Sequence, residues 1–141
     1  MKQNRVGRII LMSAAAFTAV GGFLADWNKT HLFNPRWTPH AKFHDAMTIM
    51  LGALLGSSGW YLLQKKGNNN QTQLLGGAVL PSFFWIAMAT SFAFPGAKGL
   101  EAEFPDKIKK IGGIPLNEGL LSTIMLSALA FGYSIARKKG R

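Results

Sequence analysis

Four long apolar segments alternate with short polar segments along the chain. They cover residues 6–25, 45–64, 74–95 and 116–136, and each contains at most one charged residue. A helix of about twenty residues, rising about 1.5 Å per residue, crosses the roughly 30 Å hydrocarbon core of a bilayer. The pattern therefore predicts an all-α integral membrane four-helix bundle, with residues 1–141 forming a single domain.

Capping residues indicate where two of these helices begin. Thr38 and Pro39 precede the second segment as an N-cap residue and a first-turn proline, so this helix should start outside the membrane. Pro115 opens the fourth segment and places Glu118 in its first turn. Pro81 lies inside the third segment, where neighbouring helices can accommodate a bend.

Stripes of small residues predict that the first two helices touch. Helices in lipid associate where small side chains allow their backbones to approach closely. The stripes consist of Ala14, Thr18, Gly21 and Ala25 in the first helix and of Gly52, Gly56 and Gly59 in the second. We expect these two stripes to face each other.

The composition also indicates lipid surroundings. Hydrophobic residues make up 48% of the chain and charged residues only 16%, both shifted away from the averages of soluble domains. The net charge of +10 would suit nucleic acid, but the basic residues cluster at the ends of the apolar segments and no nucleic-acid-binding motif accompanies them. We therefore expect a lipid bilayer, and no nucleic acid, as the partner of these charges.

Four spans place both termini and the linker at residues 65–73 on one side of the membrane. That side would carry nine basic residues and no acidic residue, whereas the other would carry seven basic and all six acidic residues. Because basic loops tend to stay in the cytoplasm, we expect a multi-pass cell-membrane protein with cytoplasmic termini and two short extracytoplasmic loops. Gly67 and the asparagines after it predict a tight turn in the linker.

All acidic residues and histidines fall on the predicted outer side. They are Asp26, His31, His40, His44, Asp45, Glu101, Glu103, Asp106 and Glu118. The inner side is also polar, yet it contains no such group. This asymmetry favours a functional site on the outer side, with solvated loop residues as the alternative interpretation.

Two histidines one helical turn apart are the first candidates for chemistry. His40 and His44 can act as a base or hold one divalent metal ion, such as zinc or iron, with His31 as a third ligand. Without a third ligand, a hydrogen-bonded helix cap is the alternative. Asp45 and Glu118 are candidate catalytic carboxylates at the mouth of the bundle, or acids that merely cap helix starts.

The first outer loop supplies the candidate ligand-binding residues Asp26, Asn34, Arg36 and Trp37. Asp26 would orient an imidazole, and Arg36 would anchor an acidic group or pair with Asp45. Aromatic residues in this loop also suit a belt at the membrane interface, which is the alternative role of Trp37.

The segment THLFNPRWTPHAKFH, residues 30–44, resembles a family of small four-span membrane proteins of unknown function found in bacteria and fungi, and the likeness extends along the chain. The resemblance implies the topology but no activity. We expect a site that binds a small lipophilic molecule or a metal ion, and catalysis stays open. The alternative is a non-enzymatic accessory subunit docked to another membrane protein. A channel or transporter ranks last because only scattered Ser and Thr lie within the spans.

Overall fold

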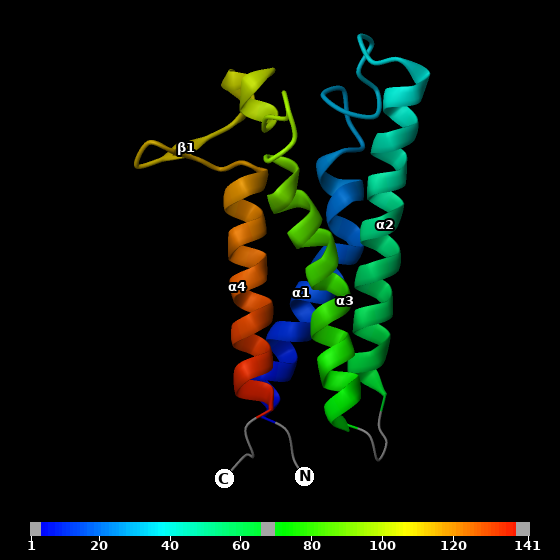
Figure 1. Ribbon diagram of the computed structural model, residues 1–141, viewed down its shortest axis with the longest axis vertical. Coiled ribbons are helices and arrows are strands. Elements are labelled where there is room, and N and C mark those ends of the chain that lie inside the picture. The colour runs from blue at the N-terminus through cyan, green and yellow to red at the C-terminus, as the bar shows by residue number, and fades with distance from the viewer. Residues whose placement is uncertain (1–3, 66–69, 138–141) are drawn as a thin grey trace.

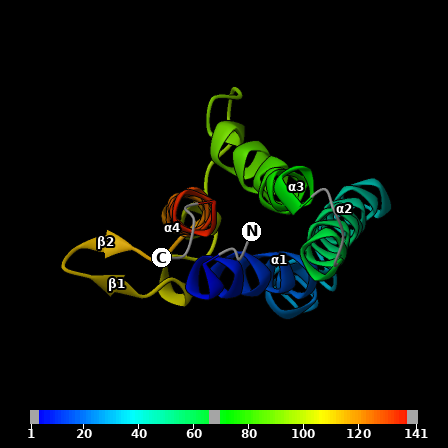
Figure 2. The ribbon, with the colours of Figure 1, turned by 90° about the horizontal axis from the view of Figure 1, so that it is seen from below.

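The protein is a bundle of four long helices with two loops at one end. A computed structural model describes residues 4–65 and 70–137. The helices are α1 (Arg5–Ala25), α2 (Pro39–Gln64), α3 (Asn70–Ser91) and α4 (Glu118–Ala136), and each is long and apolar enough to cross a membrane. Each helix packs against the next, and α4 returns to α1 (Figures 1 and 2). The predicted all-α membrane architecture is confirmed.

The start of α1 and the end of α4 lie at the same end of the bundle (Figure 1). The backbone N–H of Asn4 donates to the carbonyl oxygen of Ala136 at 3.4 Å, so α1 starts where α4 finishes. The loops at residues 26–38 and 92–117 meet at the opposite end, here called the loop end. The turn predicted after Gly67 falls largely outside the described residues.

Three helix boundaries differ from the prediction. α3 begins at Asn70, inside the linker that was expected to end at residue 73. α3 ends at Ser91, before Pro95, because the residue preceding a proline disfavours helical backbone and Gly96 adopts a positive φ of 78°. α4 begins at Glu118 and not at Leu116. Its N-cap is Asn117, whose Oδ1 accepts a hydrogen bond from the Leu120 N–H at 3.1 Å.

A short hairpin occupies the place where the fourth helix was expected to begin. Strands β1 (Lys110–Ile111) and β2 (Ile114–Pro115) pair in antiparallel fashion, after two 3₁₀ turns at Leu100–Ala102 and Pro105–Lys107. Gly112 and Gly113 form the turn with φ of 57° and 83°, a region that glycine adopts without steric penalty. This Gly-Gly pair was the available signal for the hairpin.

α2 begins as predicted and its glycine stripe contacts α1. Thr38 Oγ1 accepts from the Ala41 N–H at 3.2 Å, with Pro39 in the first turn. A Cβ added at Gly56 would lie within 3 Å of backbone atoms of Ala15 and Ala19. The predicted contact between the first two helices is therefore confirmed.

Two glycines of the predicted stripes lie outside the contact between α1 and α2. Gly59 does not face α1, because a Cβ there would lie 2.7 Å from the ring of Pro81 in α3. Gly21 of α1 has only the Phe17 ring within 4 Å of such a Cβ, so it takes no part in a close helix contact. Gly59 of α2, which has no side chain, leaves space for the ring of Pro81 inside α3.

α1 crosses the bundle diagonally. Near the chain ends, a Cβ at Gly7 would lie within 3 Å of backbone atoms of Gly132 and Ala136 in α4. Near the loop end, α1 instead approaches α2, because a Cβ added at Gly22 would lie 3.1 Å from the Cα of Ile49. α1 and α4 therefore diverge towards the loop end.

Candidate functional site

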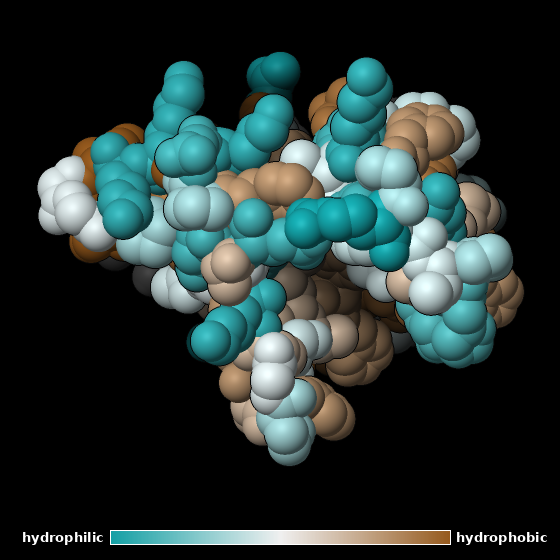
Figure 3. Space-filling view, turned by 90° about the horizontal axis from the view of Figure 1, so that it is seen from above, coloured by the Kyte–Doolittle hydropathy of each residue, from teal (hydrophilic) through white to brown (hydrophobic). Residues whose placement is uncertain are grey.

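A pocket of about 400 Å³ opens at the loop end, where α1 and α4 diverge. Its wall comes from apolar side chains of α1, α3 and α4, and loop residues cover it. The main wall and cover residues are Phe17, Trp85, Met88, Leu121, Leu100 and Ile108. Seen from the loop end, hydrophilic side chains cover much of the face, and hydrophobic side chains are visible in a hollow between them (Figure 3).

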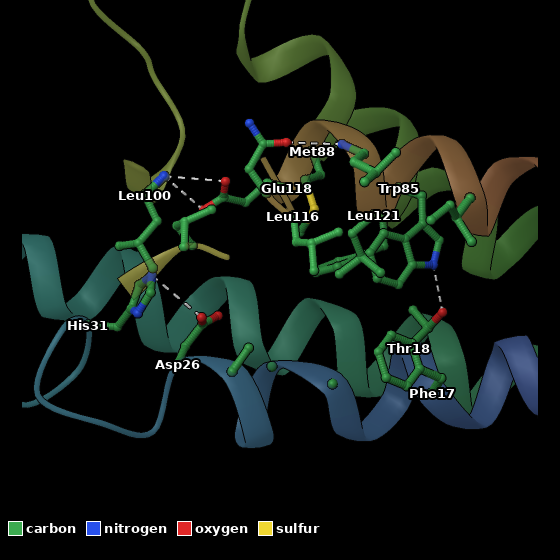
Figure 4. Close-up of a pocket in the computed structure, with 18 residues that line it drawn as sticks. Phe17, Thr18, Asp26, His31, Trp85, Met88, Leu100, Leu116, Glu118 and Leu121 are labelled. Carbon is green, nitrogen blue, oxygen red and sulfur yellow. Dashed lines mark hydrogen bonds and ion pairs between the residues drawn. The ribbon is translucent and has the colours of Figure 1, made fainter. Parts of the chain in front are cut away.

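One end of this pocket is polar (Figure 4). Asp26 follows α1, His31 lies in the loop at residues 26–38, and Glu118 occupies the first turn of α4. His31 Nε2 lies 3.6 Å from Asp26 Oδ1. The Glu118 carboxylate accepts the backbone N–H of Leu100 at 3.1 and 3.3 Å, which ties the second loop to α4.

Towards the opposite end of the pocket, the polar atoms satisfy one another. Trp85 Nε1 donates to Thr18 Oγ1 at 2.8 Å, and Thr18 donates its own proton to the carbonyl of Ala14 at 2.8 Å. Both side chains are almost fully buried. Chemistry in this pocket is therefore confined to the end formed by Asp26, His31 and Glu118.

A compact turn around Asn28 orients His31 towards Asp26. Asn28 Oδ1 accepts from both the N–H and the hydroxyl of Thr30, at 2.8 and 2.6 Å, and its amide donates to the carbonyl of Ala25. The Thr30 hydroxyl donates its only proton to Asn28. The hydroxyl oxygen of Thr30 therefore acts as acceptor for the N–H at Nδ1 of His31, at 2.9 Å. The other ring nitrogen, Nε2, then faces Asp26.

His31 is an electrostatic partner of Asp26, because the 3.6 Å between Nε2 and Oδ1 is too long for a hydrogen bond. Burial raises the pKa of Asp26 above its usual range, His31 opposes the increase, and the negative charges of Asp45 and Glu118 add to it. Asp26 can therefore keep a proton at a pH where an exposed carboxyl has lost it, and it lines the pocket.

The raised pKa of Asp26 predicts a pH dependence of stability. Between its ordinary pKa, about 4, and its raised pKa, the folded protein binds a proton that the unfolded chain has lost. The free energy of unfolding should thus fall as the pH rises through this window. Below the window, ionisation of Asp26 should not affect it. Asp26→Asn is expected to raise the apparent melting temperature in detergent at pH 8 and to match the wild type below pH 4. A lower melting temperature than the wild type at pH 8 would contradict this assignment.

Two buried carboxylate oxygens at the loop end lack a hydrogen-bond donor in the described part of the chain. They are Asp45 Oδ2 and Glu101 Oε2. Asp45 lies close enough to Asp26 for its charge to raise the pKa of that carboxyl. Gly99 separates Glu101 from Glu118, since a Cβ there would lie within 3 Å of an oxygen of each. Carboxylates from both loops and two helices thus gather beside the pocket.

His40 and His44 lie outside the pocket. Both are exposed on α2, and their Nε2 atoms are 3.1 Å apart, so the structure brings together the predicted pair. It places His31 beside Asp26 and in the pocket lining, where neither other histidine lies. Within residues 4–65 and 70–137, no three His, Cys, Asp or Glu side chains are placed to hold one metal ion.

Arg36 joins the two loops of the loop end. It donates to Glu103 Oε1 at 2.6 Å, and its guanidinium lies 5.6 Å from the centre of the Phe104 ring. Both charged partners are largely exposed. Arg36 therefore pairs with an acid of the second loop and not with Asp45, the partner suggested by the sequence.

Asn34 and Trp37 help to shape the first loop. Asn34 is 1% exposed, donates to the carbonyl of Thr30 at 3.2 Å and accepts the N–H of Arg36 at 3.0 Å. Trp37 meets the His31 ring edge to face, with ring centres 5.7 Å apart. Neither side chain lines the pocket. Both hold the loop that presents His31.

Asp26, His31 and Glu118 were candidate site residues in the sequence, but the residues of the pocket wall were not. Trp85, Met88 and Leu121 lie within segments whose apolar character already suits lipid, so no local signal distinguishes them. Only the divergence of α1 from α4 shows that these side chains face an internal space.

Comparison with known proteins places the chain in a family. No curated protein and no solved structure matches it. The model of the family of unknown function DUF6640 matches residues 10–141, which include both loops of the loop end and all four helices except the start of α1. The chain therefore belongs to this family of unknown function.

Proposed function

We propose that this membrane protein binds a small lipophilic molecule whose head group donates hydrogen bonds. The observation that carries the proposal is an apolar pocket of about 400 Å³ with Asp26, His31 and Glu118 at one end. Ligand pockets of comparable size combine apolar walls with a few polar groups that orient the ligand. The tail would lie against Trp85 and Leu121, and the head group would lie beside the carboxylates.

The head group should decide which molecule binds. Lipid tails are as apolar as the pocket wall, so moving a tail from the bilayer into the pocket contributes little. Hydrogen bonds to charged groups contribute about 1.5–3 kcal/mol each. The carboxyl groups of Asp26 and Glu118 line the pocket and favour a hydrogen-bond donor, and their negative charge disfavours a carboxylate. A protonated amine fits best, followed by a hydroxyl.

The raised pKa of Asp26 adds proton transfer to what this end of the pocket can support. A head group beside Asp26 would meet a carboxyl group that can accept or donate one proton. General acid–base chemistry is thus the reaction type that this end of the pocket can support, and binding by itself needs no such exchange.

Three molecules with the same tail test the proposal. Equilibrium dialysis of the detergent-purified chain should show decylamine bound at least about tenfold more tightly than decanoate, with decanol between them. Glu118→Gln should reduce this preference for the amine. Glu103→Gln should preserve it, because Glu103 pairs with Arg36 and does not line the pocket.

The outcome separates binding from the alternative role. Equal affinity for the three head groups, or an unchanged preference in Glu118→Gln, would overturn the proposal. Absence of binding together with co-purification of one larger membrane complex would support the accessory-subunit alternative instead.

We also propose that the chain ends lie in the cytoplasm. By sequence, nine basic residues belong to the chain-end side of the bundle and seven belong to the loop end. Such a distribution of basic residues typically keeps a side cytoplasmic. A C-terminal reporter that is active only after export should stay inactive, and an active one would reverse the orientation.

A further inference from the structure

A second group of side chains at the loop end can bind a ligand independently of the pocket. His40 and His44 lie one turn apart on α2, and their Nε2 atoms face each other at 3.1 Å. Both side chains are exposed, and neither lines the pocket. We propose that these two imidazoles bind a divalent transition-metal ion.

The spacing of the two nitrogens suits one ion. Metal–nitrogen bonds to histidine are about 2.0–2.1 Å long, so nitrogens 3.1 Å apart subtend about 100° at a shared ion. This angle lies between those of square-planar and tetrahedral coordination. The two nitrogens are hydrogen-bonded to each other, so both rings must turn towards the ion for their lone pairs to reach it.

The surrounding structure limits the entropy lost on binding. Thr38 and Pro39 hold the start of α2, so the backbone that carries both histidines is already ordered. The Phe43 ring stacks against His40 with centres 6.2 Å apart and meets His44 edge to face at 5.6 Å. These contacts restrict the rotation of both imidazoles before an ion arrives.

The ligand type selects the class of metal. Imidazole nitrogen suits copper, nickel and zinc, with Cu²⁺ bound most tightly, whereas Ca²⁺ and Mg²⁺ prefer oxygen ligands. His31 is engaged with Thr30 and Asp26, so the site has two protein ligands. Water would complete the coordination, and the ion would exchange readily.

Titration with Cu²⁺ tests this site. The full chain, purified in detergent without a histidine tag, should bind one equivalent, and its electron paramagnetic resonance spectrum should show two coupled imidazole nitrogens. His40→Gln and His44→Gln should each weaken binding at least about tenfold, which corresponds to about 1.4 kcal/mol. His31→Gln, the matched control from the first loop, should bind Cu²⁺ like the wild type.

Three results would overturn the proposal. They are wild-type affinity in His40→Gln, an equal loss in His31→Gln, and a spectrum with a single coupled nitrogen. Because His40 and His44 are exposed, the variants should keep their helical circular dichroism, which separates loss of the site from loss of the fold. Mg²⁺ in excess should not compete.

Discussion

Replacing Gly56 with valine is expected to prevent stable folding of the bundle. Even a Cβ at this position would lie 2.4 Å from the Ala19 nitrogen and 2.6 Å from the Ala15 carbonyl oxygen. Overpacking costs about 1–3 kcal/mol where side chains can move aside, and backbone atoms of a neighbouring helix cannot do so. α1 and α2 would have to separate along their shared face. Gel filtration in detergent should show aggregated protein or a strongly lowered yield.

Gly21→Ala is the matched control for this prediction. Gly21 belongs to the predicted stripe of α1, yet a Cβ there would only touch the Phe17 ring at 3.8 Å. Alanine is also favoured over glycine inside a helix by up to about 1 kcal/mol. Its apparent melting temperature should be unchanged or slightly raised. If Gly56→Val and Gly21→Ala purify equally well and melt together, the close contact between α1 and α2 is wrong.

Filling the pocket with Leu121→Trp is expected to reduce decylamine binding by roughly two orders of magnitude. Leu121 lies on the pocket wall, away from the carboxylates, so the indole would occupy space that the tail requires. A hundredfold loss corresponds to about 2.7 kcal/mol, near the upper end of overpacking costs. Equilibrium dialysis measures the loss, and the polar end of the pocket stays intact.

Leu126→Trp provides the comparison on the same helix. Leu126 is also half-buried and packs against the core, but it does not line the pocket. It should keep the affinity of the wild type even if the larger side chain lowers the melting temperature. Equal binding by Leu121→Trp and the wild type would show that decylamine adsorbs elsewhere, for example through surface charge alone.

Local sequence determined the four spans because helices in lipid satisfy their own backbone hydrogen bonds. An apolar segment of sufficient length therefore predicts a span without knowledge of its neighbours. The start of α2 could also be predicted from local sequence, because Thr38 and Pro39 act within one helical turn. Where the prediction was wrong, at Pro115, the glycine turn of the hairpin competed with a helix start over the same few residues.

Tertiary structure alone decided which ionisable groups meet. The sequence placed every acid and histidine at one end, but it grouped His31 with the two other histidines. The turn around Asn28 instead directs His31 to Asp26. The pocket has a similar origin, because the backbones of α1 and α4 approach closely at Gly7 and Gly132, whereas nearer the loop end α1 approaches α2. A helix crossing angle depends on where two backbones can approach, and this depends on residues far apart in the chain.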